Sequence, residues 1–128
     1  MTNFGRVSSA ALMLSGVSGV LTPGKVASAL QLSPLSDRGV AETRAGLGGT
    51  YAALGGWALL SRNPTAQTAV GVTWLGAAAV RMASLVVDHP STDLAFWGYL
   101  VAEVTFGAGA LASAKSNSSR RGVGPRAS

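Results

Sequence analysis

The chain has 128 residues, the length of a single domain, but only 12% of them are charged and the mean hydropathy is positive, at +0.35. This composition favours a lipid bilayer over water. The absence of cysteine excludes disulfides, thiolate metal sites and cysteine nucleophiles. The net charge of +5 suits nucleic acid binding, but four of the ten basic residues lie in the last fourteen positions, so we interpret them as a solvated tail and expect no nucleic acid partner.

Four apolar stretches approach the roughly 20 residues that a membrane-spanning helix needs, and they cover residues 4–21, 40–60, 65–87 and 93–114. They are separated by turn signals at Pro23-Gly24, Asn63-Pro64 and His89-Pro90. Because short links make consecutive helices antiparallel, the pattern predicts an all-α fold, an integral membrane up-down four-helix bundle over residues 1–114. A basic, disordered cytoplasmic tail is predicted for residues 115–128.

The region around the first stretch has more than one interpretation. Arg6, the apolar run 10–21 and the small residues up to Ala29 also imitate a secretory signal peptide that is cleaved near Ala29. Residues 25–35 suit either a short helix in the membrane interface or an ordinary loop. The sequence leaves both alternatives open.

The distribution of Lys and Arg predicts the orientation in the bilayer. An even number of spans places both termini on one side, and that side carries six basic residues at or beyond the span ends, against two on the other side. Basic residues concentrate on the cytoplasmic side of membrane proteins. We therefore expect a multi-pass protein of the cytoplasmic membrane with both termini in the cytoplasm.

Charged side chains interrupt the apolar stretches. Glu42 and Arg44 lie in the second, Arg81 and Asp88 in the third, and Glu103 near the middle of the fourth. A charged residue at the bilayer centre costs roughly 2.5–3.5 kcal/mol on insertion scales, so such residues are expected to face a partner or a wet cavity. Helical spacing puts Arg81 and Asp88 on one face, roughly 10 Å apart. The depths of the residues make Arg81 and Glu103 the expected direct pair.

Helical periodicity predicts one inward-facing stripe on each of the last three stretches. The first is a helix-packing face of one carboxylate and four small residues, and it consists of Glu42, Gly46, Gly49, Ala53 and Gly56. The second consists of Trp74, Ala78, Arg81, Leu85 and Asp88. The third consists of Phe96, Tyr99, Glu103, Phe106 and Ala110.

Two interpretations of these charges are open: structural ion pairs that fix the helix register, and a functional site. A carboxylic acid in an apolar pocket can stay protonated near neutral pH and act as a general acid, so the catalytic candidates are Glu103, Glu42 and Asp88. Guanidinium groups can bind an oxygen function, and aromatic rings an apolar body. The substrate-binding candidates are Arg44, Arg81, Tyr99, Trp74 and Phe96.

A pocket of this kind would bind an apolar small molecule with an oxygen function, and acid-base isomerisation or cyclisation of an isoprenoid-like lipid would fit it. The alternative, of a different class, is a noncatalytic accessory or scaffold subunit of a larger membrane complex. A third interpretation, a transporter or proton relay, needs several copies, as in a homo-oligomer. The sequence has no metal-ligand cluster, phosphate loop or nucleophile elbow, so neither a metal nor a cofactor is predicted.

Residues 41–58, AETRAGLGGTYAALGGWA, resemble the DUF4345 family of small four-span bacterial membrane proteins. The E-x-R-x-x-Y-G-G element of that family is matched by Glu42, Arg44 and the pair Gly48-Gly49, whereas Leu47 stands where an aromatic residue is usual. The resemblance extends over about residues 5–114. It implies a four-helix membrane bundle and no established reaction.

Overall fold

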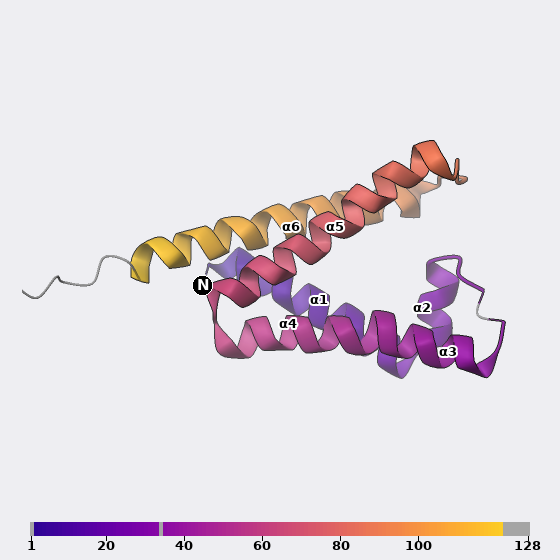
Figure 1. Cartoon of the computed structure of the whole chain (residues 1–128), viewed down its shortest axis with the longest axis horizontal. Coiled ribbons are helices and arrows are strands. Elements are labelled where there is room, and N and C mark those ends of the chain that lie inside the picture. The colour runs from indigo at the N-terminus through magenta and orange to yellow at the C-terminus, as the bar shows by residue number, and fades with distance from the viewer. Residues whose placement is uncertain (1, 34, 122–128) are drawn as a thin grey trace, which may run out of the picture.

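The computed structural model describes residues 2–33 and 35–121, and every regular element within them is a helix (Figure 1). In chain order the elements are α1 (Asn3–Leu21), α2 (Pro23–Ala29), α3 (Asp37–Thr43), the π-helical segment η1 (Arg44–Gly49), α4 (Thr50–Ser61), α5 (Pro64–Val87) and α6 (Leu94–Arg121). The prediction of an all-α fold is confirmed for the described residues. Three of the helices, α1, α5 and α6, are long and apolar enough to cross a membrane.

The predicted turn signals coincide with helix ends. Pro23 is the first residue of α2, a position where its missing N–H costs no hydrogen bond. The Asn63 side chain accepts a hydrogen bond from the Thr65 N–H at 2.9 Å and caps the start of α5. Asp93 does the same for α6, because its Oδ1 accepts from the Phe96 N–H at 2.8 Å. Because these links are short and capped, the chain reverses directly from α4 into α5 and from α5 into α6.

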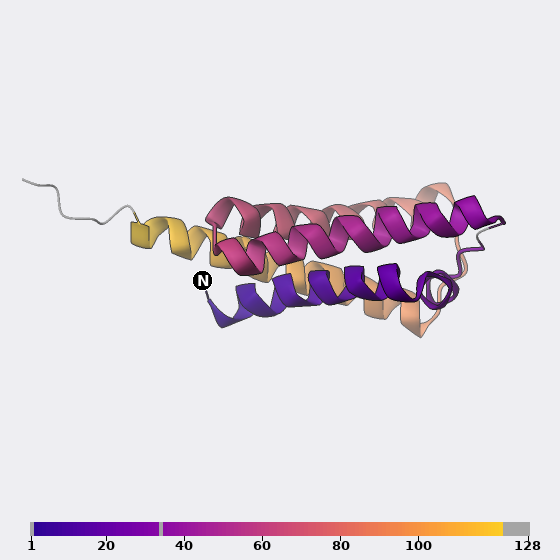
Figure 2. The same cartoon turned by 90° about the horizontal axis from the view of Figure 1, so that it is seen from below.

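The second predicted stretch forms one unbroken rod, made of α3, η1 and α4 (Figure 2). The junction residues Thr43 and Gly49 keep right-handed helical dihedrals, near φ −60° and ψ −45°. Within η1 the hydrogen bonds widen, and the Thr50 N–H donates to the Ala45 carbonyl. A π-helical turn adds one residue relative to an α-helix, so it changes which residues share a face.

The predicted packing stripe of Glu42, Gly46, Gly49, Ala53 and Gly56 is wrong. The residues of the rod that approach α1 most closely are Gly48 and Gly55: a Cβ on Gly55 would lie 2.4 Å from the Met13 backbone nitrogen. A Cβ on Gly46 or Gly49 would meet nothing within 4 Å. The prediction placed Glu42 on the packing face, but Glu42 is exposed. It also assumed α-helical spacing through η1, which is π-helical.

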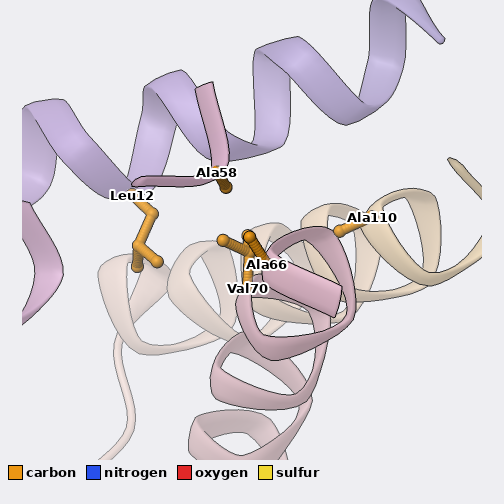
Figure 3. Packing of buried hydrophobic residues seen from close by; sticks show 5 residues of the cluster. All are labelled: Leu12, Ala58, Ala66, Val70 and Ala110. Carbon is orange, nitrogen blue, oxygen red and sulfur yellow. The ribbon is translucent and has the colours of Figure 1, made fainter. Parts of the chain in front are cut away.

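The long helices pack as two pairs. α1 lies mainly along η1 and α4, α5 lies mainly along α6, and the two pairs meet chiefly where α1 contacts α6 (Figures 1 and 2). A cluster of buried apolar side chains joins the pairs (Figure 3), and it consists of Leu12, Ala58, Ala66, Val70 and Ala110. Three of these five are alanines, which allow close approach of the helix backbones.

Large apolar side chains lie on the outside of the molecule. Leu60 is 88% exposed, Leu94 is 90% exposed and Val86 is 74% exposed, whereas the interior holds the polar residues Gln67 and Glu103. A water-soluble protein buries its large apolar residues and exposes its polar ones. The reversed distribution, together with the three long apolar helices, indicates a membrane protein.

One predicted boundary differs from the structure, and one open alternative is resolved. α6 continues to Arg121, so residues 115–121 are helical where the sequence predicted an irregular tail from residue 115. Residues 122–128 of that tail lie outside the described residues. Between the first two stretches the structure has a short helix, α2, which turns away from α1 next to the start of α3 (Figure 1).

Candidate functional site

Arg81 of α5 and Glu103 of α6 form a bidentate ion pair. The Arg81 Nε donates to Glu103 Oε2 at 3.0 Å, and Arg81 Nη2 donates to Glu103 Oε1 at 2.7 Å. The Glu103 side chain is only 8% exposed and that of Arg81 is 24% exposed. The predicted direct pair is therefore present. Two parallel charge-assisted hydrogen bonds fix the guanidinium and carboxylate planes relative to each other.

Two aromatic rings of α6 hold the same guanidinium. The Arg81 Cζ lies 5.3 Å from the ring centroid of Phe96 and 5.5 Å from that of Tyr99. These residues precede Glu103 by seven and four positions, so all three project from one face of α6. Cation–π contacts contribute about 0.5–2 kcal/mol each, depending on desolvation. Arg81 is thus oriented entirely by α6, as the stripe on the fourth stretch predicted.

Two cavities adjoin at Arg81. The inner cavity, about 380 Å³, is bounded by residues of α1, α2, η1, α4, α5 and α6, and it reaches Glu103, Tyr51 and Trp74. The outer cavity, about 640 Å³, lies toward the α5–α6 link and reaches Asp88 and Asp93. The two share walls made of Ala29, Leu30, Ala77, Arg81 and Tyr99. The ion pair therefore borders open space instead of being packed over on all sides.

Most of the candidate residues that the sequence singled out meet at these cavities. Trp74 and Glu103 line the inner one, Phe96 and Asp88 line the outer one, and Arg81 and Tyr99 line both. Asp88 is exposed at the end of α5. The arrangement combines one fixed ion pair, two phenols and an indole around an apolar space.

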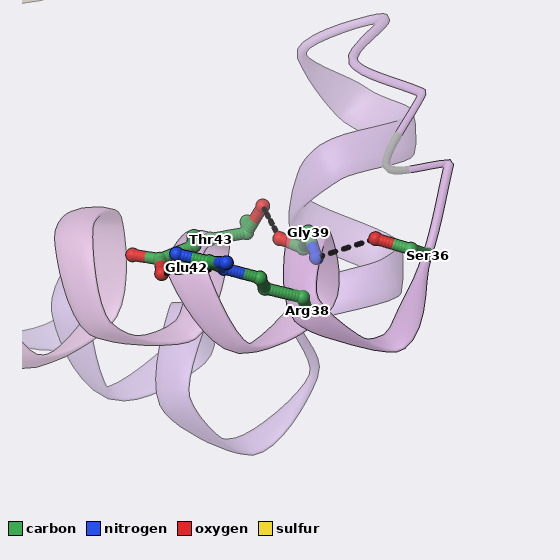
Figure 4. Close-up of polar contacts among 5 residues, drawn as sticks. All are labelled: Ser36, Arg38, Gly39, Glu42 and Thr43. Carbon is green, nitrogen blue, oxygen red and sulfur yellow. Dashed lines mark hydrogen bonds and ion pairs between the residues drawn. The ribbon is translucent and has the colours of Figure 1, made fainter.

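Glu42 and Arg44 do not belong to this site, so the prediction that all five membrane charges face inward is wrong for them. The Glu42 carboxylate lies 3.8 Å from Arg38 on the outside of α3, and both side chains are more than 70% exposed (Figure 4). The Arg44 Nη1 donates to the Val20 carbonyl at the end of α1. Arg38 precedes Glu42 by four residues, so α3 satisfies the carboxylate locally.

The start of α3 is held by its own polar side chains. Ser36 Oγ accepts a hydrogen bond from the Gly39 N–H at 3.1 Å, and Thr43 Oγ1 donates to the Gly39 carbonyl at 2.9 Å (Figure 4). The first contact is a typical N-cap, and the second is the bond that a Thr side chain makes to the carbonyl four residues earlier in a helix. Neither involves a group of the cavities, and Glu42 pairs with Arg38 on the same short helix.

A second polar cluster went unnoticed in the sequence. Gln67 of α5 is fully buried, and its Nε2 donates to Ser9 Oγ at 2.6 Å. Ser8 Oγ donates to the Phe106 carbonyl at 2.8 Å, which ties α1 to α6. Gln67 is a polar residue within an uncharged apolar stretch, and this position could have indicated a buried polar contact. The cluster joins three helices and has no cavity beside it among those described.

Comparison of the chain with family models, with curated proteins and with solved structures finds no match. The resemblance to the DUF4345 family therefore stays a prediction, and a functional assignment has to rest on the geometry around Arg81.

Proposed function

We propose that this chain is a multi-pass protein of the cytoplasmic membrane, an up-down four-helix bundle with both termini in the cytoplasm. The three long apolar helices supply three crossings. The fourth is the rod of α3, η1 and α4, whose uncharged part, residues 45–61, reaches the lower end of the roughly 17–25 residues that a crossing needs. The exposed large apolar side chains then contact lipid, and the excess of basic residues on the terminal side sets the orientation.

We propose further that the bundle binds an apolar small molecule that carries an oxygen function. The observation that carries this proposal is that the Arg81–Glu103 pair borders two cavities. A pair that served only to fix helix register would need no open space beside it, whereas this pair borders room for a small molecule. Here the guanidinium has five N–H groups, of which two donate to Glu103, so donors are left for a guest.

Binding ranks above catalysis in this proposal. A general acid must hold a proton and present it to the substrate. Both oxygens of Glu103 accept hydrogen bonds from Arg81, so an isomerase or cyclase reaction would require the substrate to displace Arg81 from one carboxylate oxygen. Asp88 lies exposed at the end of α5, and Glu42 lies outside the site. Acid-base conversion of an isoprenoid-like lipid is therefore the finer, second part of the proposal.

Mass spectrometry of small molecules that co-purify with the protein tests the binding proposal. Ala77 borders both cavities, so Ala77→Leu fills space beside Arg81, whereas Ala79→Leu adds the same side chain on an exposed position of α5. We expect an oxygen-bearing apolar compound to be enriched with the wild type and with Ala79→Leu, and depleted at least fivefold with Ala77→Leu. Equal recovery from all three proteins, or no enriched compound, would refute ligand binding at this site.

One observation favours the alternative function, a noncatalytic subunit of a larger membrane complex. Gly46, Gly49 and Ala53 lie on the outside of the rod, and a Cβ on either glycine would meet nothing within this chain. Small residues on a lipid-facing surface allow another helix to approach closely. A scaffold predicts that Gly49→Leu abolishes co-purification of a partner or a second copy while the isolated fold is unchanged. A binding protein predicts that Gly49→Leu leaves the bound compound in place.

A further inference from the structure

The charges around the cavities disfavour an anionic ligand. Among the described lining residues Arg81 is the single cation, against the three carboxylates of Asp88, Asp93 and Glu103. Glu103 already neutralises Arg81 through two hydrogen bonds. A carboxylate or phosphate group at Arg81 would therefore meet more negative than positive charge, and like charges at such contacts are strongly unfavourable.

A cationic group is disfavoured in the inner cavity for a different reason. The carboxylate that lines this cavity is that of Glu103, and both of its oxygens already accept from Arg81. An ammonium group beside the pair would lie next to the guanidinium. It would gain no free carboxylate oxygen and would be repelled by Arg81.

Hydrogen-bond donors, in contrast, are in excess. Three of the five N–H groups of Arg81 remain after the contacts with Glu103. Tyr51 and Tyr99 line the same cavity, and each carries a hydroxyl that can donate a hydrogen bond. A guest with an acceptor oxygen would pair with these donors, and hydrogen bonds to a charged group such as the guanidinium are the stronger ones.

Apart from Ser15 and Ser18 of α1, the remaining wall of the inner cavity is apolar. It includes Val26, Leu30 and Leu47, which come from α2, the turn after it and η1. Such a surface favours a hydrocarbon chain or ring over a polar body.

From these observations we infer that the ligand of the Arg81 site is electrically neutral and presents a carbonyl-type acceptor, as in a ketone, quinone or ester, on an apolar body. This inference rests on the proposed function, that the cavities bind a small molecule. It adds that neither an anionic nor a cationic head group is selected, and that the acceptor oxygen is placed among the donors of Arg81, Tyr51 and Tyr99.

Four probes of one chain length test the inference: 2-decanone, decanoic acid, decylamine and decane. The protein is reconstituted in lipid nanodiscs as the variant Trp57→Phe/Trp97→Phe, which leaves Trp74 as the single tryptophan. Because the probes partition into the bilayer to different extents, their affinities are expressed per mole of probe in the bilayer lipid. Trp57 and Trp97 are exposed, so Trp74 is the fluorophore beside the cavity. We expect a saturable change in Trp74 fluorescence with the ketone.

The expected selectivity follows from one hydrogen bond to a charged group, which changes an affinity by about tenfold or more. Decane, decanoic acid and decylamine should each bind at least tenfold more weakly than the ketone. The ketone signal should be lost in Ala77→Leu and kept in Ala79→Leu. If Ala77→Leu does not keep its helical circular dichroism, Arg81→Gln/Glu103→Gln replaces it, and the preference of the ketone over decane should then fall below threefold.

The outcomes separate the inference from the proposed function. If the acid or the amine binds more tightly than the ketone and this binding depends on Ala77, the inference is wrong and the binding function stands. If decane binds as tightly as the ketone, the acceptor is irrelevant and the inference is again wrong. If no probe gives a saturable signal that the Ala77 substitution removes, the proposed binding function itself fails.

Discussion

Removing Arg81 should destabilise the protein more than removing its partner. Arg81→Gln leaves the Glu103 carboxylate, whose side chain is 8% exposed, without the two donors that it contacts at 2.7 and 3.0 Å. Loss of one partner from a buried pair costs about 3–5 kcal/mol. Because Arg81 borders a cavity that can admit water, we expect the lower end, about 3 kcal/mol.

Glu103→Gln should have the smaller effect. The Arg81 side chain is 24% exposed and keeps the Phe96 and Tyr99 rings at 5.3 and 5.5 Å, so cation–π contacts of about 0.5–2 kcal/mol each survive. We expect a destabilisation of about 1–2 kcal/mol. The double variant Arg81→Gln/Glu103→Gln has no isolated charge and should lie within about 1.5 kcal/mol of the wild type.

The assay is an equilibrium titration of the protein in mixed micelles with increasing sodium dodecyl sulfate, followed by circular dichroism. The three variants and the wild type form a double-mutant cycle, and we expect the sum of the single effects to exceed the double effect by about 2.5–5 kcal/mol. Arg62→Gln, at the exposed end of α4, is the matched control and should change stability by less than about 0.5 kcal/mol. Additive effects, or a larger effect for Glu103→Gln than for Arg81→Gln, would refute this reasoning.

Three further outcomes follow from the packing. Gly55→Ala places a Cβ 2.4 Å from the Met13 nitrogen and should destabilise the fold by about 1–3 kcal/mol in the same titration, whereas Gly46→Ala, with open space around it, should not; equal effects would show that α4 does not contact α1 there. Gln67→Leu removes a buried carbonyl oxygen without a partner among the described residues and should stabilise the protein by about 1 kcal/mol, so a clear loss of stability would reveal a missing donor for that oxygen. Glu42→Gln breaks only an exposed pair, so stability should change by less than about 0.5 kcal/mol and co-purification of a bound compound should be unaffected; loss of the compound would return Glu42 to the site.

Helix positions were predictable because their signals are local. The stretches predicted at residues 4–21 and 65–87 correspond to helices that begin one residue earlier and end at the predicted residue. Pro at a first helical position, an Asn or Asp cap, and the length of an apolar run all act within a few residues. The end of α6 was harder to place, because residues 115–121 are polar and carry no stop signal such as Pro, and the Gly that follows them comes only at position 122.

The packing face of the rod was not predictable in the same way. Whether a Gly-rich segment adopts π-helical hydrogen bonds depends on the neighbouring helix, and η1 packs against α1 at Gly16 and Gly19. A Cβ on Gly16 would lie 2.0 Å from the Ala52 nitrogen, so the helices touch through backbone atoms. Periodicity assumes a fixed number of residues per turn, and one extra residue is enough to select a different face.

The candidate site was predicted in its centre and not at its edges. Arg81 and Glu103 lie on helices joined by a short link, so their depths in the two stretches could be compared directly. The prediction that Glu42 faces the bundle interior was wrong because Arg38, one helical turn away, pairs with its carboxylate on the outside of α3. Ala29 and Leu30 form part of the wall of both cavities, and this could not be predicted because residues 25–35 suit either a short helix or a loop.

The distance between Arg81 and Glu103 in a lipid bilayer tests the central claim most directly. Glu42 and Glu103 are the two glutamates of the chain, so in Glu42→Gln every glutamate carbon label reports on Glu103. Solid-state nuclear magnetic resonance of membrane-reconstituted protein, with labelled glutamate carboxyl carbons and arginine guanidinium nitrogens, should show strong dipolar dephasing, as expected for nitrogen and oxygen atoms 2.7 Å apart. Absence of dephasing in protein that remains folded in the bilayer would contradict the account.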